Sequence, residues 1–332
     1  MKNKLVRNTL LLGVCALFAL VVPALLILVG AIDAYTAQVL IVASINAIMA
    51  ISVNLICGIT GQLSLGQAGF MAIGAYSTVL LSLNAHFPLP LAIITSGLIT
   101  SCFGFLIGFP TLKLEGDYLA IVTLGFGEII RVVLVNLKPI TGGPNGKQFP
   151  TVLTLNRFLA FLVIAGSLIA IIILLQNFIR STYGRAILAV REDSVAANSC
   201  GINIFKYKMI GFVLASFIAG IGGAFYVSFI GFVKPDQASF TKSIDYLIFV
   251  VLGGMGSMTG SVLSSFVLTF LQEFLRILQN YRMLIYPVIL ALVMIFRPSG
   301  LMGTKEFSFV KIFERIFARK NFTHSKQELK NA

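Results

Sequence analysis

The sequence has few charged residues and few of the side chains that build metal or disulfide sites. Charged residues occupy 11% of its 332 positions, whereas a soluble domain carries about 25%. So few charges cannot cover a water-facing surface of a chain this long. The sequence holds only 2 His and 4 Cys, and no CxxC pair occurs. We therefore expect neither a metal site nor a disulfide.

Enzyme motifs are missing as well. There is no GxSxG, HExxH or P-loop sequence, and the glycine-rich runs 125–127 and 142–146 lack the context of a phosphate-binding loop. We expect no catalytic residue and no cofactor, and we expect that the chain itself does not bind ATP. The net charge is +13, but the basic residues lie in short loops and a tail without a basic–aromatic patch. This placement argues against nucleic acid and for cytoplasmic loops of a membrane protein.

Apolar residues make up 58% of the chain, and the mean hydropathy is +0.96. Repeated apolar runs of about 20 residues predict an all-α, polytopic membrane protein. The runs are continuous rather than alternating, which excludes a transmembrane β-barrel. We predict about ten crossings, at 9–30, 37–57, 63–83, 89–109, 117–137, 157–179, 209–232, 243–257, 261–276 and 283–297. Dividing the last long run at 253–260 places both termini and most of the 25 Lys and Arg residues on the cytoplasmic side.

The chain divides into three parts. Residues 1–30 are expected to form an uncleaved signal-anchor helix, because their apolar run is too long for a signal peptide. Residues 31–303 form the membrane domain, and residues 304–332 form a basic cytoplasmic tail. In the tail, Phe309, Phe313 and Phe317 share one helical face. This spacing suits a helix lying on the inner leaflet, although a solvated disordered tail is equally compatible beyond residue 320.

Two glycine-interrupted stretches follow apolar runs, one at 58–69 and one at 253–260. Their loosely similar spacing hints at a duplicated half. Broken helices expose backbone groups only where they line a cavity, so such stretches point to a transport path. The alternative is close helix packing through small residues. The candidate path residues are Gly58, Gly61, Gln62, Ser64, Gly66, Gly253, Gly254 and Gly256.

Four polar residues fall inside predicted crossings. Glu128 and Arg131 are spaced i,i+3, so they can pair on one helical face. An unpaired charge at the bilayer centre would cost about 2.5–3.5 kcal/mol. The pair is either part of the path or a structural ion pair. Asn46 and Asn54 lie eight residues apart and either contact a polar substrate or join helices through hydrogen bonds.

Residues 180–208 form the longest polar interruption before the tail. Glu192, Asp193 and Ser194 favour the first turn of a short helix, and Gly201 favours its end. The basic residues of the stretch are Arg180, Arg185, Arg191, Lys206 and Lys208. We expect a docking helix that faces the cytoplasm. The alternative is an ordinary connecting loop, although such loops are usually shorter.

Several long motifs resemble the LivM-type permeases of branched-chain amino acid ABC importers. They are GITGQLSLGQAGFMAIGAY from Gly58, LEGDYLAIVTLGFGEIIR from Leu114, TGGPNG from Thr141, YGRAILAVREDSVAANSCGI from Tyr183, VVLGGMGSMTG from Val250 and FRPSGLMG from Phe296. They occur in the family's order, and the resemblance covers roughly residues 40–303.

The resemblance implies an ABC importer permease that works in the bacterial inner membrane by alternating access. It implies a second, LivH-like permease, two cytoplasmic ATPase subunits and an extracytoplasmic binding protein that delivers Leu, Ile or Val. Loop 180–208 would contact the ATPases. The implied coupling residues are Arg185, Glu192, Asp193, Ala196, Ala197 and Gly201.

The sequence departs from the importer pattern at one position of this loop. Ala196, Ala197 and Gly201 match an EAA-x-x-x-G pattern, but Val195 stands where Glu is expected. Glu192 and Asp193 could supply the acid instead. Two alternatives stay open: a urea or short-amide permease of the same superfamily, and a secondary transporter that works alone.

Overall fold

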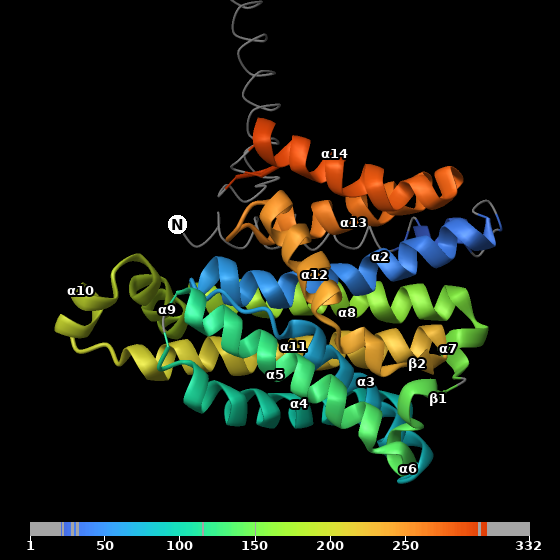
Figure 1. Cartoon of the computed structure of the whole chain (residues 1–332), viewed down its shortest axis with the longest axis horizontal. Helices are drawn as coiled ribbons and strands as arrows, with labels where there is room; N and C mark the ends of the chain where they lie inside the picture. Colours follow the sequence, from blue (N-terminus) through green and yellow to red (C-terminus); the bar gives the residue numbers. More distant parts are fainter. Residues whose placement is uncertain are drawn as a thin grey trace, which may run out of the picture.

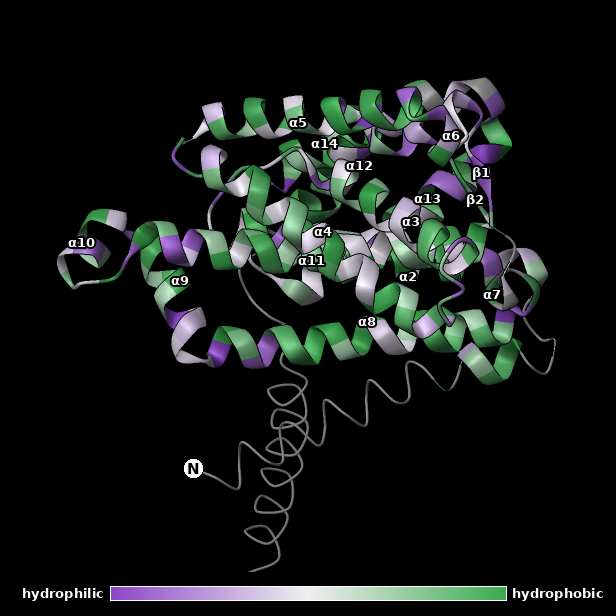
Figure 2. Ribbon diagram, turned by 90° about the horizontal axis from the view of Figure 1, so that it is seen from below, coloured by the Kyte–Doolittle hydropathy of each residue, from purple (hydrophilic) through white to green (hydrophobic). Residues whose placement is uncertain are grey.

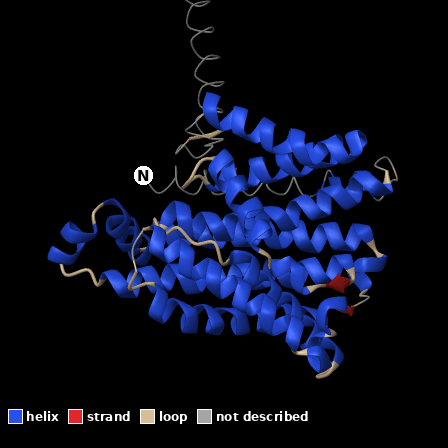
Figure 3. Ribbon diagram, in the orientation of Figure 1, coloured by secondary structure: helices blue, strands red, loops and turns tan. Residues whose placement is uncertain are grey.

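The helices of this computed structural model lie side by side in a bundle, with a two-stranded ribbon at one end (Figures 1 and 3). The structure describes residues 21, 23–27, 30, 33–114, 116–149, 151–297 and 300–303. Most of the predicted anchor 1–30 and the whole tail 304–332 lie outside the described residues. Within them, six helices are long and apolar enough to span a membrane. The all-helical prediction is therefore confirmed, and the number of ten crossings stays a prediction.

The helices and strands follow the predicted order. They are α2 (Ala34–Val53), η1 (Asn54–Ile59), α3 (Gln67–Leu83), α4 (Leu89–Thr111), α5 (Asp117–Asn136), α6 (Lys138–Thr141), η2 (Gly143–Asn145), β1 (Lys147–Gln148), α7 (Val152–Leu155), α8 (Arg157–Arg180), α9 (Thr182–Glu192), α10 (Ser194–Ser199), α11 (Ile204–Ile230), β2 (Phe232–Val233), η3 (Pro235–Ala238), α12 (Phe240–Gly253), α13 (Met258–Phe274), η4 (Leu275–Tyr281) and α14 (Arg282–Phe296).

The core of the bundle is formed by α2, α3 and α11. Helix α2 is apolar on all sides, as a helix in the centre of a bundle must be, and it packs against α8, α11 and α13. Helix α11 packs against α3 and α4. A Cβ added to Gly74 on α3 or to Gly223 on α11 would collide with the backbone of the facing helix. These small residues let the two backbones touch, which is how membrane helices associate closely.

Buried hydroxyl groups in this core are satisfied within their own helices. Ser44, Thr78 and Ser216, on α2, α3 and α11, each donate to the carbonyl four residues earlier at 2.8 to 2.9 Å. An unpaired hydroxyl away from water would be costly, so this local bond makes the residues compatible with an apolar interior.

The two ends of the bundle differ. At one end, β1 pairs antiparallel with β2, with Lys147 opposite Val233. At the other end, α9 and α10 project beyond the remaining helices, and hydrophilic residues gather there and around β1 (Figures 1 and 2). Exposed apolar side chains cover the outer faces of several helices, including α4, α5, α13 and α14. This distribution is typical of a bundle surrounded by lipid between two aqueous ends.

Several predicted boundaries shift. The crossing expected from residue 63 begins as a helix only at Gln67, and the one expected from residue 209 begins at Ile204. Most of the predicted polar loop is helical, since α9 and α10 lie within it. Hydropathy marks where lipid-compatible residues occur, whereas helix ends depend on caps and turns, so these differences are expected.

Candidate functional site

The first glycine stretch breaks the chain in an unusual way. After α2, the helix continues through the six residues of the π-helix η1, whose turns are wider. Gly61 then adopts a left-handed φ of +68°, and the chain stays non-helical until α3 begins. Glycine reaches positive φ without steric cost, so it can end the helix here. The predicted residues Gly58, Gly61, Gln62, Ser64 and Gly66 all lie in this first break, which we define as residues 54–66.

The second glycine stretch also separates two helices, as the sequence predicted. Helix α12 ends at Gly253 and α13 begins at Met258. Between them, Gly254 and Gly256 have φ values of +106° and +90°. The Ser257 hydroxyl accepts a hydrogen bond from the Gly260 amide at 3.1 Å and caps α13. We call residues 253–257 the second break.

The two breaks meet in space, which the sequence did not reveal. The Gly256 amide donates a hydrogen bond to Asn54 Oδ1 at 2.8 Å. A Cβ added to Gly58 would collide with Asn54 Oδ1 and with the Gly256 backbone. The absence of a side chain at Gly58 therefore makes the contact possible. Of the path residues, Asn54, Gly58 and Gly256 thus form one junction.

The closing motif of the chain lies against the second break. The Leu301 amide donates to the Leu252 carbonyl at 2.7 Å, and the Met302 amide donates to the Gly253 carbonyl at 3.3 Å. A Cβ added to Gly254 would collide with the backbone of Gly303. Residues 300–303 therefore hold the carbonyl ends of α12, and three of the motifs recognised in the sequence converge at this place.

The predicted docking helix is present as α10, at the projecting end of the bundle. Asp193 Oδ1 accepts hydrogen bonds from the Val195 and Ala196 amides at 2.9 and 3.0 Å, so Asp193 is the N-cap. Gly201 ends the helix with a φ of +79°. Glu192 instead closes the preceding helix α9. Within α10, Ala197 is buried and Ala196 is exposed.

Helix α9 connects this projection to the bundle. Ser181 caps its start by accepting a hydrogen bond from the Gly184 amide at 3.3 Å. Gly184 lies against the Ile179 backbone, which leaves no room for a side chain. Arg185 is exposed, and its guanidinium reaches only the Arg180 carbonyl and the Thr182 hydroxyl, both at 3.4 Å. The turn between α8 and α9 is therefore tight, and α9 is firmly placed at the bundle end.

Arg191, in the last turn of α9, was not among the predicted site residues, yet it reaches both breaks. Its Cγ lies 2.9 Å from the position that a Cβ on Gly61 would take. Its Nη1 lies 3.4 Å from the equivalent position on Gly256. The aliphatic stem therefore covers the first break, and the guanidinium lies beside the second.

The first break buries polar atoms that lack partners. Asn54, Gln62, Ser64 and Gln67 are each at most 3% exposed. The unpartnered atoms in this part of the described structure are Asn54 Nδ2, both polar side-chain atoms of Gln62, Ser64 Oγ and Gln67 Nε2. Each buried polar group without a partner costs about 1–3 kcal/mol. Such a concentration in one short segment marks it as costly in this conformation.

The two asparagines of α2 and η1 have structural partners. Asn46 Nδ2 donates to Thr269 Oγ1 on α13 at 3.0 Å, so this residue joins two helices. Asn54 joins the two breaks, as described above. The packing interpretation of Asn46 is therefore supported, and its proposed contact with substrate finds no support from this geometry.

Glu128 and Arg131 form the expected ion pair, and they also hold the start of α12. Their side chains are 2.7 Å apart, from Arg131 Nε to Glu128 Oε2, and each is 34% exposed. Glu128 Oε1 also accepts a hydrogen bond from the Phe240 amide at 3.1 Å. A carboxylate at a helix N-terminus is favourable. Nearby, the Ser243 hydroxyl accepts from the Ala68 amide at 3.2 Å, which joins the starts of α12 and α3.

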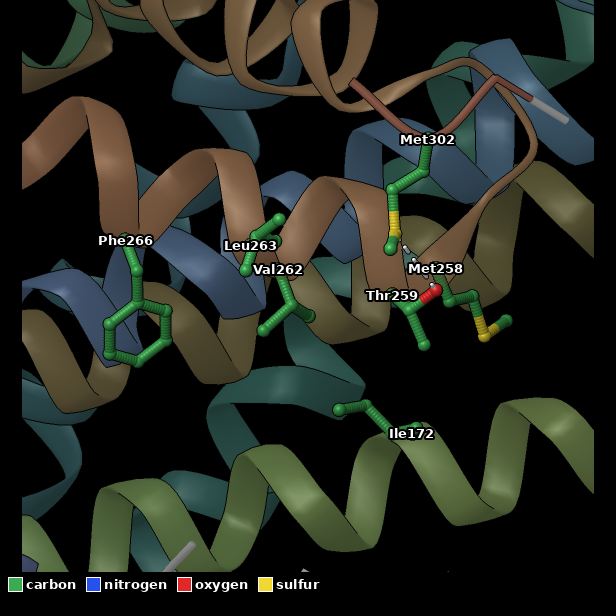
Figure 4. Close-up of a pocket in the computed structure, with 7 residues that line it drawn as sticks. All are labelled: Ile172, Met258, Thr259, Val262, Leu263, Phe266 and Met302. Atoms are coloured by element: carbon green, nitrogen blue, oxygen red, sulfur yellow. Dashed lines mark hydrogen bonds between the residues drawn. The ribbon is translucent and has the colours of Figure 1, made fainter. Parts of the chain in front are cut away.

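An apolar groove lies on the side of the bundle between α8 and α13 (Figure 4). Its cavity volume is about 490 Å³, and it is lined by Ile172, Met258, Thr259, Val262, Leu263, Phe266 and Met302. Figure 4 shows Thr259 and Met302 at one end, with Thr259 Oγ1 3.8 Å from the Met302 sulfur. None of the predicted path residues lines this groove, so we do not assign it to the candidate site.

Similar proteins include two from enterobacteria and one from an archaeon. The LivM permease protein of the high-affinity branched-chain amino acid transport system of Salmonella typhimurium is 38% identical over 264 residues, covering 70% of this chain and 61% of that protein. Its Escherichia coli K12 equivalent is 37% identical, with the same coverage. A probable LivM of Methanocaldococcus jannaschii is 25% identical over 243 residues, covering 63% of this chain and 67% of that protein. The chain thus matches less than two thirds of the length of the two enterobacterial relatives, and no solved structure gives a significant match.

The family described as "Branched-chain amino acid transport system / permease component" matches residues 35–296. This span begins one residue after the start of α2 and ends at the last residue of α14, so it includes both breaks, α9 and α10. The chain belongs to the family of permease components of branched-chain amino acid transport systems.

Proposed function

We propose that this chain is a membrane-spanning subunit of an ATP-driven importer in the bacterial inner membrane. It would translocate the branched-chain amino acids Leu, Ile and Val and would not hydrolyse ATP itself. The family membership and the LivM relatives support this function. The observation that carries the mechanism is the contact of the projecting loop, through α9, with both glycine breaks. A push on the loop from outside the membrane would reach the broken helices directly.

The proposed assembly contains four kinds of partner. A second, LivH-like permease would complete the path, and two cytoplasmic ATPase subunits would dock on α10 and its surroundings. An extracytoplasmic binding protein would deliver the substrate, and membrane lipid would surround the apolar helices. The proposed coupling residues are Arg185, Glu192, Asp193, Ala196, Ala197 and Gly201. The exposed N-cap Asp193 supports an acidic contact that replaces the Glu expected at Val195.

In this proposal about ten helices cross the membrane and both termini lie in the cytoplasm. Residues 1–30 form a signal-anchor helix, residues 31–303 form the permease domain with its coupling loop 180–208, and residues 304–332 form a basic tail. A reporter fused at Ala197 should then be cytoplasmic. A reporter that faces the other side of the membrane would invert the topology and contradict the coupling role of α10.

The path itself is proposed to open by alternating access. Its core would be the first break, with Asn54, Gly58, Gly61, Gln62, Ser64 and Gly66, and the second break, with Gly253, Gly254 and Gly256. The unpartnered polar atoms of the first break would gain water or substrate when the breaks separate. Glu128 and Arg131 would border the path by fixing the start of α12, and Asn46 would lie on its wall.

A direct test is uptake of radiolabelled leucine and urea in cells that lack the gene and in cells that regain it. We expect the gene to restore leucine uptake and to leave urea uptake unchanged. Restoration of urea uptake alone would instead favour the short-amide permease. Reconstituting the chain alone and together with its ATPases separates the remaining alternative. Ion-driven leucine uptake by the chain alone would identify a secondary transporter and overturn the proposal.

A further inference from the structure

One side chain of the projecting loop contacts both glycine breaks at once. The stem of Arg191 lies on Gly61, with Cγ, Cβ and Cδ at 2.9, 3.6 and 3.8 Å from the position of an added Cβ. Its guanidinium nitrogen Nη1 lies 3.4 Å from the same position on Gly256, and the Gly58 carbonyl oxygen lies 3.5 Å from it. The arginine therefore lies at the junction where the two breaks touch each other.

A carboxylate does not account for this placement of Arg191. The acidic contact described for it is Glu192, whose Oε1 lies 3.9 Å from Arg191 Nε and whose side chain is 76% exposed. Such a solvated pair contributes little to holding either side chain in place. The Arg191 side chain, in contrast, is 31% exposed, so most of it is covered by the breaks and by α9. The glycine backbones are what Arg191 packs on.

The chemistry of the contact suits an arginine. Broken helices leave backbone carbonyl groups outside regular helical hydrogen bonding, and a guanidinium presents five N–H donors in a rigid plane. Gly61 and Gly256 both have positive φ and no side chain, so the stem and the planar head can approach the backbone. A lysine would offer one compact charge and no such plane.

The position of Arg191 in the chain connects it to movement of the loop. Helix α9 turns tightly against α8 at Gly184 and is joined to α10 by the single residue Asp193. A displacement of α10 must therefore pass through α9 and move the arginine. We propose that Arg191 is a positioning residue that holds the two glycine breaks together in this conformation. Displacement of α9 withdraws it and lets the breaks separate. The inference rests on the proposed transport function.

The test uses Cys57, a cysteine in the first break that lies between Asn54 and Gly58. It is partly buried, so its alkylation by a thiol reagent reports how open the break is. In full-length protein whose other cysteines are replaced by serine, we expect Arg191→Met to increase the alkylation rate of Cys57 about tenfold, as expected for the loss of hydrogen bonds from a charged group. Methionine keeps an unbranched stem and removes the guanidinium. Arg191→Lys should give an intermediate rate.

The matched control is Arg180→Met, which removes the same charge at the same end of the bundle. Its alkylation rate should equal that of the unchanged protein. A rate for Arg191→Met that equals the control would overturn the inference. If Arg191→Met lowers the amount of folded protein in the membrane, Arg191→Lys decides. Its Cys57 must react faster than in the control, because one ammonium cannot replace the planar guanidinium.

A second readout links the residue to transport and separates the two proposals. In the complex with ATPases and binding protein, Arg191→Met should lower leucine uptake about tenfold and raise the ATPase activity measured without substrate. A merely structural role would lower both together. If the unchanged complex takes up no leucine, the proposed function fails, whereas the Cys57 result still stands or falls independently. If the unchanged complex is active and Arg191→Met couples normally, only the role of Arg191 is overturned.

Discussion

The two ends of α12 show opposite treatments of polar groups inside the bundle. At its start, Glu128 bonds both to Arg131 and to the Phe240 amide, and the Ser243 hydroxyl bonds to the Ala68 amide. At its other end, the second break touches a segment in which Gln62 lacks any partner for its side-chain amide. The satisfied end has the properties of a fixed clamp. The unsatisfied end has the properties of a segment that adopts a second conformation in which those groups are solvated.

The strongest way to break this contrast is to add bulk where the two breaks meet. Gly58→Val should destabilise the folded protein by about 3 kcal/mol and abolish uptake, because its side chain collides with Asn54 and with the Gly256 backbone. Thermal unfolding in detergent measures the loss. The control is Gly125→Ala, since Gly125 is helical and an added Cβ meets nothing within 4 Å. It should be neutral or stabilising by up to about 1 kcal/mol. Equal effects of both variants would contradict the junction.

The clamp at the start of α12 gives the next largest effect. Glu128→Leu should destabilise the protein by about 2.5 kcal/mol, because Arg131 is then unpaired within a span and the Phe240 amide loses its acceptor. Chemical unfolding in detergent measures it. The double variant Glu128→Leu with Arg131→Leu should recover most of the stability and part of the uptake. Complete loss of uptake in a stable double variant would instead assign the pair to the transport path.

The unsatisfied end should respond in the opposite direction. Gln62→Leu removes two unpartnered polar atoms from a site that is 3% exposed. We expect the protein to become more stable by about 1–2 kcal/mol, while uptake decreases because the alternative conformation loses a polar contact. Unfolding and uptake are measured on the same preparation. A variant that loses stability would show that Gln62 is satisfied in the resting protein.

The smallest effect is expected at the start of α10. Asp193→Ala removes the acceptor for the Val195 and Ala196 amides and should weaken this helix by about 1 kcal/mol. Faster hydrogen exchange of the α10 amides measures the change. Asp193→Asn keeps an acceptor and should retain the helix. Any loss of uptake in Asp193→Asn therefore reports the charge rather than the cap.

The sequence predicted those features whose signals are local. The cap at Asp193 and the end at Gly201 follow from residue types within one turn of the helix, and the structure has both. The division at residues 253–260 followed from charge balance, and α12 and α13 do separate there. The i,i+3 spacing of Glu128 and Arg131 also predicted their pairing. Each of these needs no knowledge of distant segments.

The features that the sequence did not predict depend on contacts between distant segments. The hydrogen bond from Gly256 to Asn54 joins residues 202 positions apart, which no spacing indicates. The π-helical end of α2 was missed for the same reason. Arg191 carried a weak signal, because it follows Gly184 and Ile187 on the buried face of α9 at helical spacing. An arginine on that face required a partner, and identifying it required the fold.

The local bonding of buried hydroxyls has a mechanical consequence for the core. Because Ser44, Thr78 and Ser216 each bond within their own helix, the seams around α2, α3 and α11 hold fewer cross-links than their polar composition suggests. Sliding one of these helices along its neighbour would leave such bonds intact and exchange only dispersion contacts. The interior of the bundle is thus compatible with shear, and resistance to it is concentrated where a side chain crosses a seam, as Asn46 does toward Thr269.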